Sequence, residues 1–99
     1  MEIRIQSIHF TADQKLIDYV EKKIGKLSQF YDRIHDVDVF LKFDSAHSQI
    51  KEKSVNIKMK VPGSTLDAEE HSSTFETATD KAVESLKRQL LKHKDKQRK

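Results

Sequence analysis

The sequence contains 99 residues, of which 35% are hydrophobic and 35% are charged, with a net charge of +3 and no cysteine. A chain of this length forms one domain with one modest core, which excludes a separate catalytic domain. Because it lacks cysteine, a signal-peptide apolar region and a run long enough to span a bilayer, we expect no disulfide, no thiolate metal site, no membrane partner and a cytoplasmic location.

The first third of the chain predicts a strand followed by a helix. Ile3 and Ile5 alternate with polar residues, which is typical of a half-buried strand, and we extend its buried side to Ile8. Thr11 with Gln14 three residues later forms a capping box that marks a helix start. Apolar residues then recur at helical spacing and predict an amphipathic helix: Leu16, Ile17, Val20, Ile24 and Leu27.

The remaining residues predict three strands and a final helix. Strict alternation indicates strands over residues 37–43 and 55–61, and Pro62-Gly63 is a turn signal before a weaker strand over residues 65–71. Either Ser73 with Glu76, or Thr74 itself, can cap the last helix. Its predicted buried positions are Phe75, Ala78, Ala82, Val83, Leu86 and Leu90.

The predicted fold is α+β in the order β-α-β-β-β-α. Because the apolar residues of each strand lie on one face, the two helices must cover that face of a four-stranded sheet. Its last five elements resemble the topology of double-stranded RNA-binding domains. We assign residues 1–94 to a single domain and residues 95–99 to a basic, flexible tail.

Positive charge is concentrated near the end of the chain. Residues 1–27 contain 5 basic and 4 acidic side chains, residues 28–80 contain 6 and 10, and residues 81–99 contain 8 and 2. A basic end on a near-neutral body favours a polyanionic partner, while a solvated lysine-rich helix end is the alternative interpretation.

The basic residues of both helices are aligned on a helical wheel. Lys15, Lys22 and Lys26 share one flank of the first helix, with Tyr19 between them and Lys23 at the border of the apolar face. The last helix places three basic residues opposite its apolar stripe: Lys81, Arg88 and Lys92. Two such ridges fit phosphates better than base edges. The alternative is that i, i+4 pairs, such as Asp18 with Lys22 and Glu84 with Arg88, only solubilise the helices.

No residue pattern indicates catalysis or a resident metal. The chain has no glycine-rich phosphate loop and no recognisable nucleophile motif, and its five histidines are too scattered for a local ligand motif. Asp36 and Asp38 are interpreted as cross-strand charges close to Lys42 and Lys58. We therefore expect a binding protein that is not an enzyme and needs no cofactor.

Two segments resemble the ribosome hibernation promoting factors and the related ribosome-associated inhibitor A proteins. The first is residues 26–34 (KLSQFYDRI), which run into the strand around residues 39–42. The second is residues 86–96 (LKRQLLKHKDK), which are similar to the family's C-terminal helix signature almost residue for residue. The resemblance extends over nearly the whole chain, and it implies the same order of elements as the pattern predicts.

The resemblance also implies a partner and a site. Family members bind the small ribosomal subunit through ribosomal RNA at the decoding region, where they occlude messenger RNA and the A-site and P-site transfer RNAs and so inhibit translation. Their basic contacts come mainly from the two helices. The implied rRNA-binding residues are Lys22, Lys23, Lys26, Lys87, Arg88, Lys92 and Lys94. We expect no DNA partner and a monomeric free protein.

Two departures and two alternatives accompany this hypothesis. Many relatives begin the last helix with an acidic residue and a tyrosine, where this chain has Thr74-Phe75-Glu76. The chain ends at Lys99 without the second domain by which long members pair ribosomes, so any effect on ribosome dimers would need another factor or mechanism.

A generic duplex-RNA binder would need a basic start to the last helix. A small enzyme or protein-interaction adaptor would use the open sheet face around Phe40, but the sequence shows no catalytic constellation and no obvious exposed apolar patch.

Overall fold

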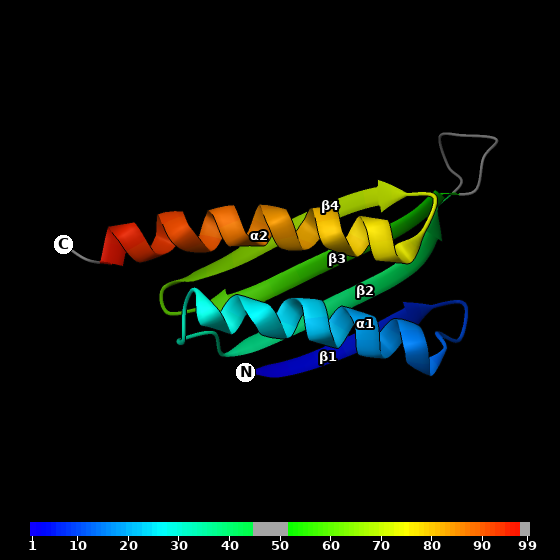
Figure 1. Ribbon diagram of the computed structural model, residues 1–99, viewed down its shortest axis with the longest axis horizontal. Helices are drawn as coiled ribbons and strands as arrows, with labels where there is room; N and C mark the ends of the chain where they lie inside the picture. The colour runs from blue at the N-terminus through cyan, green and yellow to red at the C-terminus, as the bar shows by residue number, and fades with distance from the viewer. Residues whose placement is uncertain (45–51, 98–99) are drawn as a thin grey trace.

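The computed structural model describes residues 1–44 and 52–97, which form a sheet layer and a helix layer (Figure 1). The elements are β1 (Glu2–Ile8), α1 (Gln14–Gly25), the 3-10 helix η1 (Lys26–Gln29), β2 (Asp36–Asp44), β3 (Glu52–Val61), β4 (Ser64–Ser72) and α2 (Phe75–Gln97). The strands form one sheet in the order β1-β2-β3-β4, and both helices lie on the same face of it. The predicted α+β class and element order are confirmed.

The sheet is mixed, because β1 is parallel to β2 whereas the β2–β3 and β3–β4 pairs are antiparallel. A parallel pair requires a crossover connection, and α1 with η1 provides it. Ile3 lies opposite Val37 and Ile5 opposite Val39. Since successive strand residues point to opposite faces, Ser7 continues this buried side and Ile8 faces the other way, so the inward placement predicted for Ile8 is wrong.

The core lies between the sheet and the two helices. Its central layer consists of strand residues with no measurable exposure: Val37, Val39, Leu41, Val55, Ile57 and Met59. The helices cover it with Val20 and Ile24 from α1 and with Ala78, Ala82, Leu86 and Leu90 from α2. The predicted helical and strand periodicities therefore meet in one hydrophobic cluster.

Each helix has a side-chain cap at its start. The carboxylate of Asp13 accepts a hydrogen bond from the Leu16 backbone N–H at 2.8 Å. The predicted Thr11 cap is wrong because α1 begins at Gln14, so Asp13 occupies the capping position. For α2, the Thr74 hydroxyl accepts from the Thr77 N–H at 3.1 Å, which confirms one of the two predicted alternatives.

The turn between β3 and β4 is the predicted one. Val61 pairs with Ser64, and Gly63 between them has a φ of 78°, a conformation that glycine adopts without steric cost. Helix α2 continues through Gln97, so residues 95–97 extend the helix instead of beginning a tail, and residues 98 and 99 lie outside the described residues. None of the described helices is long and apolar enough to cross a membrane.

Candidate nucleic-acid interface

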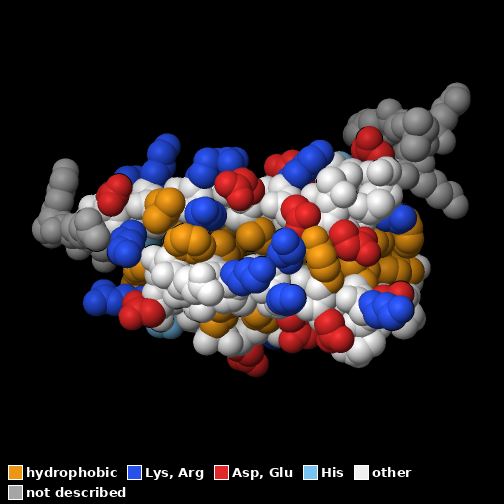
Figure 2. Space-filling model, viewed as in Figure 1, with side chains coloured by type: hydrophobic (Ala, Val, Ile, Leu, Met, Phe, Trp, Pro, Cys, Tyr) orange, Lys and Arg blue, Asp and Glu red, His pale blue; other side chains and the backbone are white. Residues whose placement is uncertain are grey.

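Helices α1 and α2 run in the same direction, so their C-terminal ends lie at the same end of the molecule (Figure 1). The last turn of α1 contains Lys22 and Lys23, and the last turn of α2 contains Lys94 and Lys96. Lysines at helix C-termini are favourable because they oppose the negative end of the helix dipole. The parallel arrangement therefore gathers positive charge at one end, and Figure 2 shows Lys and Arg side chains over both helices.

A polar contact between the helices fixes their spacing nearer their N-terminal ends. The Tyr19 hydroxyl of α1 donates to the Asp80 carboxylate of α2 at 2.7 Å, and the Lys23 ammonium lies 3.6 Å from the same carboxylate. The hydrogen bond to Asp80, with smaller effects of burial and of nearby carboxylates, raises the pKa of Tyr19 to about 12. Tyr19 therefore remains a neutral donor at physiological pH, and part of the charge of Lys23 is neutralised within the protein.

Beyond the C-terminal end of α1, η1 and the residues that follow it form a hollow with the C-terminal part of α2. A cavity of about 410 Å³ is lined by Ser28, Gln29, Phe30, Tyr31, Asp32, Arg33 and Lys94. The Lys87 ammonium of α2 lies 4.7 Å from the centre of the Phe30 ring at its rim. The ring of Tyr31 packs edge-on against His93 of α2 at 5.6 Å, which holds the segment after η1 against that helix. We call Phe30, Arg33, Lys87 and Lys94 the basic hollow.

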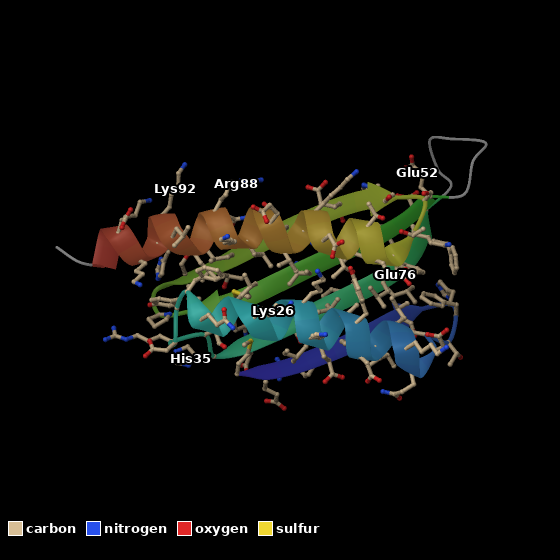
Figure 3. The ribbon with its side chains drawn as sticks, in the orientation of Figure 1. Lys26, His35, Glu52, Glu76, Arg88 and Lys92 are labelled. Carbon is tan, nitrogen blue, oxygen red and sulfur yellow. The ribbon has the colours of Figure 1, made fainter. Side chains whose placement is uncertain are left out.

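The structure divides the predicted rRNA-binding residues of α2 between two flanks. Lys87 and Lys94 face the α1 side, as their contacts with the basic hollow show. Arg88 and Lys92 point away from α1 along the other side of α2 (Figure 3). Lys92 there lines a smaller cavity of about 200 Å³ with residues of β4 and with Gln89, His93 and Lys96. The ridge of Lys81, Arg88 and Lys92 seen on the helical wheel is thus separate from the surface that the two helices share.

In the part of the chain that the structure describes, the predicted rRNA-binding side chains are mostly free of acidic partners. Within residues 1–44 and 52–97, Lys23 is the one member of the predicted seven with a carboxylate ion pair. The i, i+4 pairs of the alternative interpretation do not form in this part of the chain; Asp18 instead accepts a hydrogen bond from Gln14 at 2.8 Å. Six cations therefore remain available to external phosphates: Lys22, Lys26, Lys87, Arg88, Lys92 and Lys94.

Sequence reasoning missed Phe30 and Arg33 as members of the site. Both lie in residues 26–34, the segment that carries the family resemblance, but no helical periodicity marks them because η1 ends at Gln29. Only the packing of this segment against α2 brings them beside Lys94. An aromatic ring beside cations is a combination that RNA-binding surfaces use for base stacking and phosphate contact.

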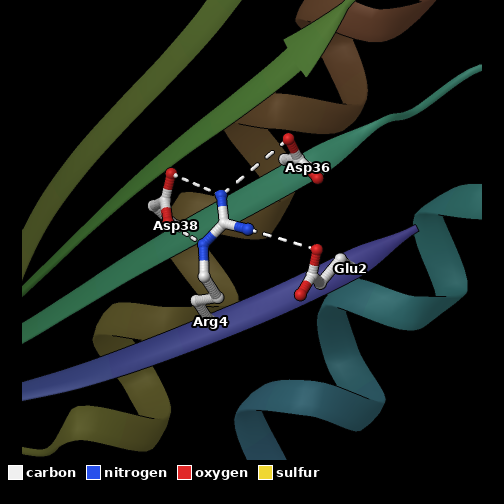
Figure 4. A network of polar contacts seen from close by, with 4 residues as sticks. All are labelled: Glu2, Arg4, Asp36 and Asp38. Carbon is white, nitrogen blue, oxygen red and sulfur yellow. Dashed lines mark hydrogen bonds and ion pairs between the residues drawn. The ribbon is translucent and has the colours of Figure 1, made fainter.

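The opposite face of the sheet has a different electrostatic character. Arg4 of β1 bonds Asp38 of β2 at 2.8 and 3.3 Å and lies 3.3 Å from Glu2 and 3.9 Å from Asp36 (Figure 4). The hydrogen bond from Arg4 is the main reason that the pKa of Asp38 is lowered. The predicted association of these aspartates with Lys42 and Lys58 is incomplete, because β1 lies beside β2 and places Arg4 opposite Asp38.

Comparison with known proteins identifies the family. Residues 3–98 match the family described as sigma 54 modulation protein / S30EA ribosomal protein. The chain belongs to this family. A ribosome hibernation promoting factor from Pseudomonas putida is 30% identical over 97 residues, which cover 98% of this chain and 90% of that protein. Ribosome hibernation promotion factors from Deinococcus radiodurans and Bacillus subtilis are 36% and 32% identical, and the matches cover 40% and 50% of their lengths.

Solved structures confirm the fold of this S30EA-family chain. A ribosomal subunit interface protein from Coxiella burnetii superposes with a TM-score of 0.85 at 24% identity, covering 96% of this chain and 99% of that one. The N-terminal domain of Thermus thermophilus Protein Y gives a TM-score of 0.77 at 25% identity, with coverage of 93% and 94%. Among the described residues of the present chain, no group of three or more His, Asp or Glu side chains is arranged to hold a metal ion.

Proposed function

We propose that this S30EA-family chain is a ribosome hibernation factor that binds the small ribosomal subunit through ribosomal RNA. Bound at the decoding region, it would occlude messenger RNA and the A-site and P-site transfer RNAs and so inhibit translation in the cytoplasm. The observation that carries the proposal is the set of six cations on α1, η1 and α2 that have no acidic partner among the described residues. The names of its relatives, ribosome hibernation promoting factors, support the ribosome as the partner.

The proposed binding depends on counterion release. Each phosphate that a lysine or arginine neutralises frees condensed cations, so the affinity falls steeply as salt rises. Four phosphate contacts, counted without Arg88 and Lys92 on the outer flank of α2, correspond to a slope of roughly −3 to −4 in a plot of log affinity against log salt concentration. The contacts would lie on helices packed against a sheet, so little ordering entropy should oppose binding.

Generic duplex-RNA binding has less support from the structure. The first turn of α2 contains Glu76 and no basic residue, whereas its basic residues lie in later turns. A phosphate at the start of this helix would therefore meet a carboxylate. This distribution favours a partner that contacts the C-terminal ends of both helices.

Co-sedimentation with isolated small subunits tests the proposal. A variant with Lys22, Lys26 and Lys94 changed to alanine should lose most of its binding at moderate salt, because it removes three unpaired cations from both helices. The matched control changes Lys42, Lys58 and Lys60 to alanine, three exposed lysines of the sheet. This control removes the same charge from the other face and should bind almost normally.

Competition then tests the location. Initiator transfer RNA with messenger RNA should displace the wild-type chain from the small subunit if both occupy the decoding region. Binding that transfer RNA does not affect would refute occlusion while leaving ribosome binding intact. Equal loss of binding in the two triple variants would show that overall charge, and not the helical surface, determines the association.

A further inference from the structure

The cavity of the basic hollow has a size that suits a small ligand. Its volume of about 410 Å³ falls within the range of roughly 300–1,000 Å³ that is typical of small-ligand sites. Residues 28–33 form one side of the cavity and Lys94 of α2 lies on the other. A phosphate backbone needs exposed cations but no cavity, so this shape favours a second kind of contact.

The cations of this cavity are available to a ligand. Arg33 and Lys94 line it, and neither forms an ion pair within residues 1–44 and 52–97. Lys87 adds a third cation at the rim. Asp32 is the one carboxylate among the lining residues, so the cavity has an excess of positive charge and attracts an anionic group.

The loop that follows η1 adds unpaired backbone donors. The Phe30 N–H donates to the Leu27 carbonyl at 3.0 Å, and the next N–H along this loop that donates to a backbone carbonyl is that of His35, at 2.9 Å from Lys60. The N–H groups of residues 31–34, between them, belong to no helix or strand. Such groups bind water or an anion, and clusters of them beside cations are common in phosphate sites.

An aromatic ring and an amide in the same cavity suit a nucleobase. Phe30 lines the cavity, and the Lys87 ammonium lies 4.7 Å from the centre of its ring. Stacking on an aromatic ring binds unpaired bases with little sequence preference. The exposed Gln29 side chain also lines the cavity, and its amide can donate to and accept from the edge of a base. Bases that are paired within a duplex are not available for stacking on a side chain.

Contacts within the protein hold the cavity in shape. Tyr31 is 7% exposed, and its ring packs edge-on against His93 of α2 at 5.6 Å. Leu27 and Ile34, on either side of the loop, are buried in the core. Because these contacts fix the loop, binding a ligand there costs little ordering of the protein.

We infer that the basic hollow binds one unpaired nucleotide of RNA, base and phosphate together. The base would stack on Phe30 beside Gln29. The phosphate would contact Arg33, Lys94 and the backbone N–H groups of residues 31–34. This inference rests on the proposed function, because it names the form of RNA that this part of the surface accepts. It adds a stacking contact that salt does not weaken, since stacking releases no counterions.

An NMR titration of the isotopically labelled full chain tests the inference without a ribosome. The probe is adenosine 5′-monophosphate, and the controls are ribose 5-phosphate, which lacks the base, and adenosine, which lacks the phosphate. The mononucleotide should shift the amide signals of Gln29, Phe30, Arg33 and Lys94, and each control should bind about tenfold more weakly. Equal affinity for ribose 5-phosphate would overturn the inference by showing a site for phosphate alone, and so would unchanged signals at these residues.

Variants separate stacking from charge. Phe30→Leu keeps an apolar side chain where Phe30 packs against the core, and it should weaken mononucleotide binding about fivefold without changing the salt dependence. Arg33→Gln with Lys94→Gln should weaken binding and also reduce the salt dependence. The matched control is Phe40→Leu, which changes a partly exposed ring of β2 outside the cavity and should bind normally. An equal loss in Phe40→Leu, with all variants folded by circular dichroism, would contradict stacking on Phe30.

A single-stranded oligoadenylate identifies the source of the nucleotide. It should bind at the same residues more tightly than the mononucleotide, and annealing it to oligouridylate should abolish the shift of Phe30 because the bases are then paired. Tighter binding of the free mononucleotide would overturn RNA as the ligand. Co-sedimentation separates the two proposals. A chain that binds small subunits but no mononucleotide would retain the proposed function without this inference, and the reverse result would refute the proposed function alone.

Discussion

The two flanks of α2 carry different basic residues, so mutations can test which flank contacts RNA. Lys87 and Lys94 lie on the side of α2 that joins the basic hollow, whereas Arg88 and Lys92 point away from α1 (Figure 3). A single RNA surface that contacts both helices must meet the flank that they share. We therefore predict that Lys87→Gln with Lys94→Gln weakens binding to the small subunit much more than Arg88→Gln with Lys92→Gln.

The expected size of the effect follows from the two phosphate interactions that the Lys87 and Lys94 variant removes. Each such interaction contributes about 1 kcal/mol, so removing two lowers the affinity roughly 30-fold. The slope of log affinity against log salt should fall in magnitude by about 1.5, because two fewer counterions are released. Each double variant removes two positive charges, so a general electrostatic effect would change both equally.

The assay is fluorescence anisotropy of the labelled chain with isolated small subunits at several salt concentrations. Glutamine retains part of the aliphatic stem of Lys87, which keeps the packing against Phe30 largely intact. Circular dichroism on each variant checks that the helices remain folded. A larger loss of affinity for the Arg88 and Lys92 variant would refute the shared-flank reasoning and place the RNA along the outer side of α2.

Three further predictions concern the fold that positions this surface. Asp13→Ala should lower the free energy of unfolding by about 1 kcal/mol in urea denaturation, while Thr11→Ala should change it little, because Asp13 caps α1. Leu86→Ala should cost about 2–5 kcal/mol in the same assay, because Leu86 of α2 is fully buried; a smaller decrease would mean that the core collapses around the cavity. The hydrogen bond to Asp80 raises the pKa of Tyr19 to about 12, above the unfolded value, so its contribution to stability is complete below about pH 10 and is lost as the pH rises through 12. Spectrophotometric titration of a Tyr31→Phe variant, which leaves Tyr19 as the sole tyrosine, should show this late ionisation, and titration near pH 10 would contradict the contact.

Much of the fold could be predicted from local pattern. The alternation over residues 37–43 and 55–61 and the helical spacing from Leu16 to Leu27 correspond to elements that the structure contains. The errors occur at the boundaries. Thr11 is displaced as a cap by Asp13, and Ile8 faces away from the core, because capping and strand parity depend on where an element begins. The end of α2 lies further along the chain than the charge pattern suggested.

Only part of the candidate site could be found in the same way. The lysines of each helix are visible on a wheel because they belong to one periodic element. Phe30 and Arg33 lie in a segment without helical spacing, and they join the site only because η1 and the following residues pack against α2. The pairing of Arg4 with Asp38 likewise depends on β1 lying beside β2, 34 residues further along the chain.

The sequence by itself determines which residues alternate, which recur at helical spacing and where charge accumulates, because those properties depend on neighbours along the chain. Tertiary structure decides which flanks meet. It aligns α1 and α2 so that their basic ends coincide, and it separates Lys87 and Lys94 from Arg88 and Lys92. It also collects Phe10, Phe43 and Phe75 at the opposite end. The physical reason is that the orientation of the helices and the order of the strands decide which residues share a surface. Hydrophobic burial fixes that orientation and order only when the whole chain packs.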